Sequence, residues 1–162
     1  MKITVWLTEG TWPDCVDAAR DLAEAGDAEI TLLVVREQSD EDRRSKGFGS
    51  LMGRGPHKRM ADEMESLTQQ AAETMLSEAE RRLGLPATTS LETGLTERVV
   101  TAAAQHVDYL IVGRDGDRSR LGPHSLGKHT RFVIDHAPCR VLVIWPGTAP
   151  DIGSIPPPPP DR

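Results

Sequence analysis

The stretch that decides the fold runs from residue 109 to residue 144 and reads YLIVGRDGDRSRLGPHSLGKHTRFVIDHAPCRVLVI. It opens on a short apolar run, residues 109–112, which is typical of a buried strand. A polar, glycine-rich loop follows, and then a helix is predicted from near Gly127 to near His136. Pro138 prevents that helix from continuing, and residues 140–144 are predicted to form a second buried strand. Glycine loops that lead into a helix often bind anions, because backbone N–H groups and the helix dipole both favour negative charge.

This stretch resembles the carboxyl-terminal half of the universal stress protein family. That family carries Gly-x2-Gly-x9-Gly-(Ser/Thr) after its fourth strand and a His-Ala-Pro-Cys-like turn before its fifth strand. Gly113 and Gly116 match the first two glycines, and residues 136–139 match the turn. Ten residues separate Gly116 from Gly127, and Lys128 stands where the family has Ser or Thr. The resemblance covers about residues 2 to 146.

The rest of the chain alternates between apolar strands and amphipathic helices. Further strands are predicted at residues 3–7, 30–35 and 88–91. Helices are predicted between these strands, within residues 11–26, 60–83 and 96–107. The first two strands are apolar almost throughout, which is typical of a parallel sheet covered on both faces. The pattern therefore predicts an α/β fold: a single-domain, open, five-stranded parallel sheet with helices on both faces, as the resemblance also implies.

The long second helix shows an apolar stripe at helical spacing, which we predict to face the core. Its members are Met60, Met64, Leu67, Ala71, Met75, Ala79 and Leu83. A polar, glycine-rich loop at residues 36–56 precedes this helix. After the last strand the chain ends in IPPPPPDR, which cannot join a sheet. We therefore expect a domain at residues 1–148 and a disordered proline-rich tail at residues 149–162.

Ligands of open parallel sheets bind beyond the carboxyl ends of the strands. The first strand leads into Glu9-Gly10-Thr11, which resembles the Asp-Gly-Ser of the family, although Thr11 with Asp14 also fits a helix capping box. The second strand ends near Val35. The resemblance implies ATP or AMP as the ligand, with Mg²⁺ accompanying ATP. The candidate nucleotide-binding residues are Glu9, Gly10, Thr11, Val35, Gly113, Gly116, Gly127, Lys128, His129 and Thr130.

Charge indicates the same class of ligand. The net charge of −6 argues against nucleic-acid or membrane-surface binding, yet five cations and two acids lie between residues 113 and 131. The extra residue of the loop is expected to bulge outward within residues 117–124. An inward loop would instead place Arg118 or Arg120 at the phosphate position. No run of 18 apolar residues and no signal peptide are present, so we expect a cytoplasmic protein.

Two functions remain open from the sequence. The first is a stress-response module that binds an adenine nucleotide and acts through regulated interaction; the second is an interaction module of the same fold without nucleotide. No nucleophile–base pair and no metal-ligand spacing can be assigned, so we name no catalytic residue and no metal ligand, and expect at most weak ATP hydrolysis. The resemblance implies a homodimer, and the apolar last strand, Val141 to Trp145, is the expected pairing edge.

Overall fold

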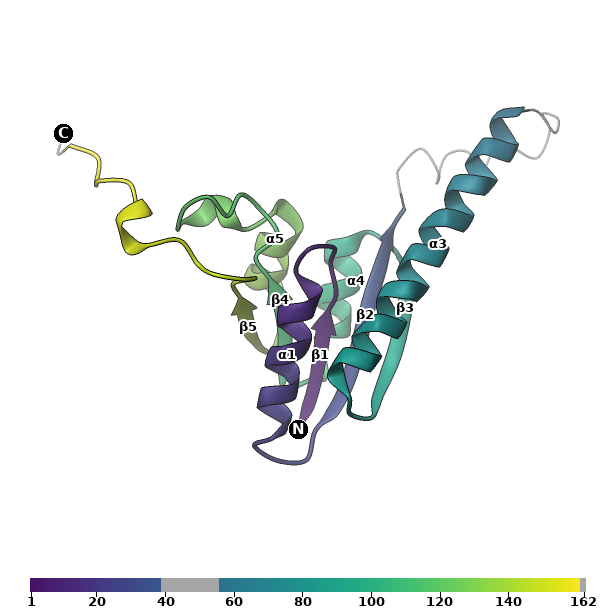
Figure 1. Cartoon of the computed structure of the whole chain (residues 1–162), viewed down its shortest axis with the longest axis horizontal. Coiled ribbons are helices and arrows are strands. Elements are labelled where there is room, and N and C mark those ends of the chain that lie inside the picture. Colours follow the sequence, from purple (N-terminus) through teal and green to yellow (C-terminus); the bar gives the residue numbers. More distant parts are fainter. Residues whose placement is uncertain (39–55, 161–162) are drawn as a thin grey trace.

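The computed structural model describes residues 1–38 and 56–160, so most of the predicted loop at residues 36–56 lies outside the described part. Five parallel strands form one sheet in the order β3-β2-β1-β4-β5 (Figure 1). The strands are β1 Lys2–Trp6, β2 Glu29–Glu37, β3 Ala87–Gly94, β4 Tyr109–Gly113 and β5 Arg140–Ile144. The predicted five-stranded parallel fold is confirmed.

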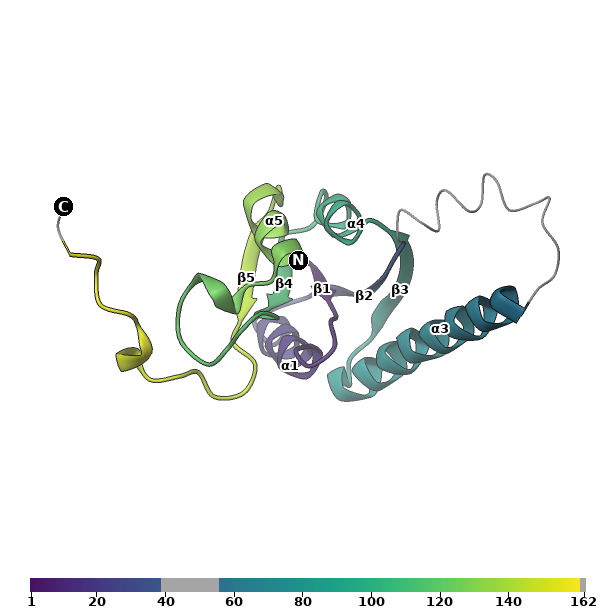
Figure 2. The same ribbon diagram turned by 90° about the horizontal axis from the view of Figure 1, so that it is seen from above.

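Helices cover both faces of this sheet. Figure 2 shows α1 and α3 on one side of the strands and α4 and α5 on the other. The helices are α1 Trp12–Ala23, α3 Pro56–Leu83, α4 Thr96–Ala103 and α5 Lys128–His136. Two short 3-10 helices lie in the carboxyl-terminal half of the chain, η1 Pro123–Ser125 and η2 Ile152–Ser154.

Alternation along the strands divides the apolar side chains between two cores. Val5 and Leu32 point toward α1 and α3, and they pack with Val16 and Leu83. The opposite core contains Trp6, Leu33, Leu110 and Val112 of the strands together with Val100 of α4 and Val133 of α5. Burial on both faces explains why β1, β2 and β4 are largely apolar, whereas the edge strand β3 is mostly polar.

The first half of α3 departs from the predicted stripe. Met60, Met64 and Leu67 are 63%, 64% and 64% exposed, because this part of the helix projects beyond the edge of the sheet (Figure 1). The buried positions begin later and are Ala72, Leu76, Ala79 and Leu83. The predicted inner stripe is therefore wrong for its first four members, because Ala71 is exposed as well.

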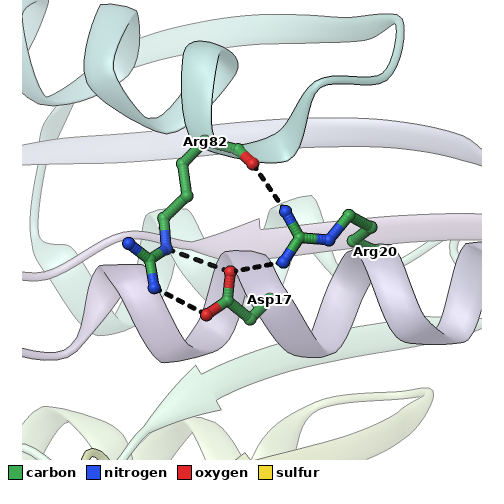
Figure 3. A network of polar contacts seen from close by, with 3 residues as sticks. All are labelled: Asp17, Arg20 and Arg82. Carbon is green, nitrogen blue, oxygen red and sulfur yellow. Dashed lines mark hydrogen bonds and ion pairs between the residues drawn. The ribbon is translucent and has the colours of Figure 1, made fainter.

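A polar network joins α1 to the end of α3 (Figure 3). The Asp17 carboxylate accepts hydrogen bonds from Arg82 Nη2 at 2.7 Å and from Arg20 Nη2 at 2.9 Å. Arg20 Nη1 also donates to the Arg82 carbonyl oxygen, which belongs to the last turn of α3. The hydrogen bond from Arg82 and its positive charge hold the pKa of Asp17 below its usual range. The network thus fixes α1 against the carboxyl-terminal end of α3.

The described tail is hydrogen-bonded to the glycine loop, where the Leu121 N–H donates to the Ser154 hydroxyl at 3.0 Å. Beyond this contact the chain extends away from the sheet toward the C-terminus (Figure 1). The division into a domain and a disordered tail stays a prediction. Within residues 1–38 and 56–160, none of the helices combines the length and the apolar character that a membrane span requires.

Candidate functional site

Two loops meet at the carboxyl edge of the sheet, between β1 and β4. Thr11 is buried at the N-cap of α1, and Gly113 is the buried last residue of β4. A Cβ atom on Gly113 would lie 2.6 Å from Thr11 Oγ1, so only a glycine permits this approach. The Thr11 hydroxyl lies 2.5 Å from that of Thr8 and makes no capping hydrogen bond, so the predicted capping box is absent. Thr11 instead closes the β1–α1 loop against β4.

The tip of the β1–α1 loop is open to solvent. Gly10 has a φ of 76°, a left-handed conformation that suits glycine, and Glu9 beside it is exposed. The Gly10 carbonyl oxygen accepts a hydrogen bond from Arg118 Nη1 at 3.4 Å. The glycine loop therefore reaches across to the β1–α1 loop through the Arg118 side chain.

The glycine loop folds back on itself soon after β4. The Gly116 N–H donates to the Ser125 carbonyl oxygen at 2.9 Å, and the Asp117 N–H donates to the His124 carbonyl oxygen at 2.8 Å. A Cβ on Gly116 would lie 2.9 Å from the Ser125 carbonyl carbon, so the two segments touch directly. Residues 117–120 and 122–124, which lie beyond these bonds, are exposed. These residues form an outward loop, and the place of the extra residue within it stays a prediction.

Asp115 occupies the start of α5. Its Oδ1 atom accepts a hydrogen bond from the Gly127 N–H at 2.8 Å and another from the Thr130 hydroxyl at 2.9 Å. A Cβ on Gly127 would lie 2.9 Å from the same oxygen, so the carboxylate lies directly against the glycine backbone. A negative group at a helix N-terminus is favoured by the helix dipole. The chain therefore supplies its own anion where the sequence predicts a ligand phosphate.

Three arginines hold the loop in place, two from the loop itself and one, Arg131, from α5. Arg114 Nη1 donates to the buried Ser125 hydroxyl at 2.6 Å, and its guanidinium stacks 5.0 Å from the Trp145 ring centre. Arg131 Nη2 donates to the carbonyl oxygen of Pro123. These contacts, together with that of Arg118, stabilise the outward loop and tie it to the end of β5. Much of the predicted basic charge of the loop thus has a structural role.

His129, in the first turn of α5, faces carboxylates. Its Nδ1 atom lies 2.7 Å from Glu97 Oε2 of α4, and its Nε2 atom lies 3.4 Å from Glu37 Oε1 at the end of β2. The backbone N–H of Glu97 and then the hydrogen bond with His129 lower the pKa of the Glu97 carboxyl. Lys128, the preceding residue, is exposed. His129 therefore links three elements at the carboxyl edge of the sheet.

The structure brings most of the predicted site residues to one edge, where some meet each other and some meet residues outside the predicted set. Thr11 meets Gly113, whereas Gly127 and Thr130 meet Asp115. Val35 instead packs with the core beneath α4 and α5. The unforeseen partners are Asp115, Ser125, Glu37 and Glu97. Of these four, only Asp115 could have been indicated by the sequence, because it is an acid between two loop glycines that precede a predicted helix.

The residues at this edge fit a bound nucleotide and its metal ion only in part. The predicted phosphate donors, the Gly127 N–H and the Thr130 hydroxyl, already donate to a carboxylate. Among the residues that the structure describes, no three His, Cys, Asp or Glu side chains are grouped to hold a metal ion. An Mg²⁺ ion would thus depend on ligand oxygens, with Asp115 as the nearest protein carboxylate at the start of α5. A groove of about 390 Å³ between Leu121, Pro123 and Ile155 lies on the outer side of the loop.

Comparisons with known proteins agree on the fold. The hypothetical protein MJ0577 superposes with a TM-score of 0.64 and 20% identity, covering 91% of this chain and 97% of its own. A universal stress protein in complex with cAMP gives 0.60 and 18%, covering 91% and 98%. UspA from Lactobacillus plantarum gives 0.59 and 20%, covering 89% and 97%. No curated protein matches the chain in sequence.

The family model of the universal stress proteins matches residues 13–144. This range begins in α1 and ends on the last residue of β5, so it includes the glycine loop and all strands except β1. The match covers most of the chain, and the five-stranded parallel sheet agrees with it. The chain therefore belongs to the universal stress protein family.

Proposed function

We propose that this protein is a stress-response module that binds an adenine nucleotide, ATP or AMP, at the carboxyl edge of β1 and β4. The observation that supports this proposal best is the direct contact of Thr11 with Gly113, because it joins the β1–α1 loop and the glycine loop at one edge. Such an edge is where open parallel sheets bind ligands. A structurally similar universal stress protein is a complex with cAMP, which also favours an adenine ligand.

Such a module would act by binding its nucleotide and not by catalysing a reaction of it. Cys15, the cysteine nearest to the β1–α1 loop, is buried, and burial raises the pKa of its thiol to about 12, so it is no nucleophile near neutral pH. A bound nucleotide would bridge the loops after β1 and β4 and thereby change the surface that a protein partner contacts. Mg²⁺ would be brought by ATP and held mainly by its phosphates.

A second candidate is an interaction module of the same fold that binds no nucleotide. It is favoured by one observation, the Asp115 carboxylate on the two groups that were predicted to hold a phosphate. In both candidates we propose a cytoplasmic homodimer that pairs through β5. The edge position of β5 and the 38% exposure of Leu142 support that pairing.

Two measurements separate the candidates. Mass spectrometry of ligand released from freshly purified protein should detect an adenine compound. Calorimetry should show saturable heat with at least one of adenosine, AMP, ADP and ATP at concentrations up to about 1 mM, which corresponds to about 4 kcal/mol of binding free energy. No released ligand together with no heat from any of these compounds would leave the interaction module as the function.

A further inference from the structure

We infer that Asp115 determines the ligand charge at this site, so that the protein prefers adenosine to AMP and AMP to ATP. The inference rests on the proposed adenine site and specifies its ligand class. Its basis is that one carboxylate oxygen of Asp115 accepts from both the Gly127 N–H and the Thr130 hydroxyl. These are the two groups at the start of α5 that a ligand phosphate would need.

Space at the start of α5 leads to the same conclusion. A Cβ on Gly127 would lie within 2.9 to 3.1 Å of three atoms of the Asp115 carboxyl group. The carboxylate is thus packed on the glycine backbone, and a phosphate cannot enter between them without moving Asp115. Moving it breaks two hydrogen bonds and takes the carboxylate from the positive end of the helix dipole. A nucleoside without phosphate requires no such displacement.

Neighbouring charges strengthen this selection. Arg114, Arg118 and Arg131 donate hydrogen bonds to Ser125 and to the carbonyl oxygens of Gly10, Arg114 and Pro123, and none of these bonds is with Asp115. Glu37 and Glu97 add two carboxylates beside His129, the second residue of α5. A phosphate at the start of α5 would meet the Asp115 carboxylate, whereas Glu37 and Glu97 contact His129, and Lys128 is the exposed cation of the same turn. Like charges at short distance disfavour binding, and each added phosphate should increase this effect.

The matched controls come from the chain itself. Asp115→Asn removes the charge and keeps an oxygen that can accept from Gly127, so the start of α5 should remain intact. Asp115→Ala removes the carboxylate altogether. Asp117→Asn makes the same change of charge two residues away, where the Asp117 carboxylate accepts from the Ser119 N–H and lies exposed on the outward loop.

The first test is calorimetry of the full chain with adenosine, AMP and ATP, each in EDTA and in Mg²⁺. We expect the wild type to bind adenosine more tightly than ATP by a factor of at least about ten, in line with one lost charge-assisted contact. Asp115→Asn and Asp115→Ala should lower the preference for adenosine over ATP by about tenfold, which would remove or reverse it. Asp117→Asn should leave the ratio within about twofold, because exposed charges at a distance are screened.

The second test uses inorganic tripolyphosphate and needs no adenine site. We expect it to raise the melting temperature of Asp115→Ala but not that of the wild type or Asp117→Asn. Three results would overturn the inference. One is ATP binding more tightly than adenosine to the wild type, and another is equal effects of the Asp115 and Asp117 changes. The third is Mg²⁺-dependent ATP binding that Asp115→Asn abolishes, which would make Asp115 a metal ligand.

The two proposals fail in different ways. If none of the proteins binds an adenine compound, the proposed function fails, and the tripolyphosphate result alone decides whether Asp115 excludes phosphate. If adenine compounds bind the wild type but ATP binds best, the proposed function stands and the selectivity of Asp115 is refuted. If only the Asp115 variants bind ATP, Asp115 excludes phosphate as inferred, and the wild type belongs to the second candidate.

Discussion

Thr11 and Gly113 touch across the carboxyl edge of the sheet, one at the start of α1 and the other at the end of β4. The contact leaves no room for a side chain on Gly113, since a Cβ there would lie 2.6 Å from Thr11 Oγ1 and 3.1 Å from Thr11 Cγ2. Thr11 itself is buried and cannot swing into solvent. The distance between the two loops of the candidate site is therefore set by this pair.

Gly113→Ala tests that relationship. We expect the extra methyl group to destabilise the fold by about 1–3 kcal/mol, as overpacking typically does, and to weaken adenine binding by displacing the β1–α1 loop. Urea unfolding measures the first effect and calorimetry the second. Gly26→Ala is the control, because a Cβ at Gly26 has no neighbour within 4 Å and its φ is not left-handed. Equal stability of the two variants would show that the Thr11 contact can relax freely.

The ion pair of Asp17 with Arg82 makes stability depend on pH. Since Arg82 lowers the pKa of Asp17 below its ordinary value of 3.8, the pair stabilises the fold above that pH and loses its effect as the pH falls further. We expect Asp17→Asn to cost about 1 kcal/mol at pH 7, a modest amount because the carboxylate is about one third exposed and is screened by water. The difference from wild type should shrink below pH 3.8 in urea titrations. Asp21→Asn, at an exposed position of α1, should show no such dependence.

Leu142→Lys tests the proposed dimer. Leu142 is 38% exposed on the edge strand β5, whereas Val143 packs against the core beneath α4 and α5. A charge at Leu142 should therefore weaken edge pairing with little loss of stability, and light scattering at tens of micromolar should give a lower mass than for the wild type. Ile152→Lys, at a residue that is 75% exposed in η2, should keep the wild-type mass. A wild type that is already a monomer would refute β5 pairing.

The centre of the sheet could be predicted because β1, β2 and β4 are buried on both faces and read as apolar runs. The ends of β2 and β3 could not be predicted. Glu37 and Gly94 pair there through the backbone, and their residue types do not indicate a strand. The exposed Met64 illustrates a related limit. Helical spacing shows which residues share a face, but not how far the sheet extends beneath that face.

The candidate site was predictable only in part. The positions of Thr11 and Gly113 follow from topology, because parallel strands end at the same edge. The partner of Gly127 does not, since Asp115 reaches α5 only after the loop reverses through the bonds of Gly116 and Asp117. Such a reversal depends on hydrogen bonds within the loop, which the spacing of its glycines alone does not encode. The same holds for His129, whose partners come from β2 and α4.

The central claim is that an adenine ligand binds where the β1–α1 loop meets the glycine loop. The most direct test is a titration of the ¹⁵N-labelled protein with AMP, followed by ¹H–¹⁵N correlation spectra, which suit a chain of 17.7 kDa. The claim predicts saturable shifts of the backbone amides of Gly10, Thr11 and Gly113. It would be contradicted by unchanged spectra at millimolar AMP, or by shifts confined to the outer groove at Leu121 and Ile155.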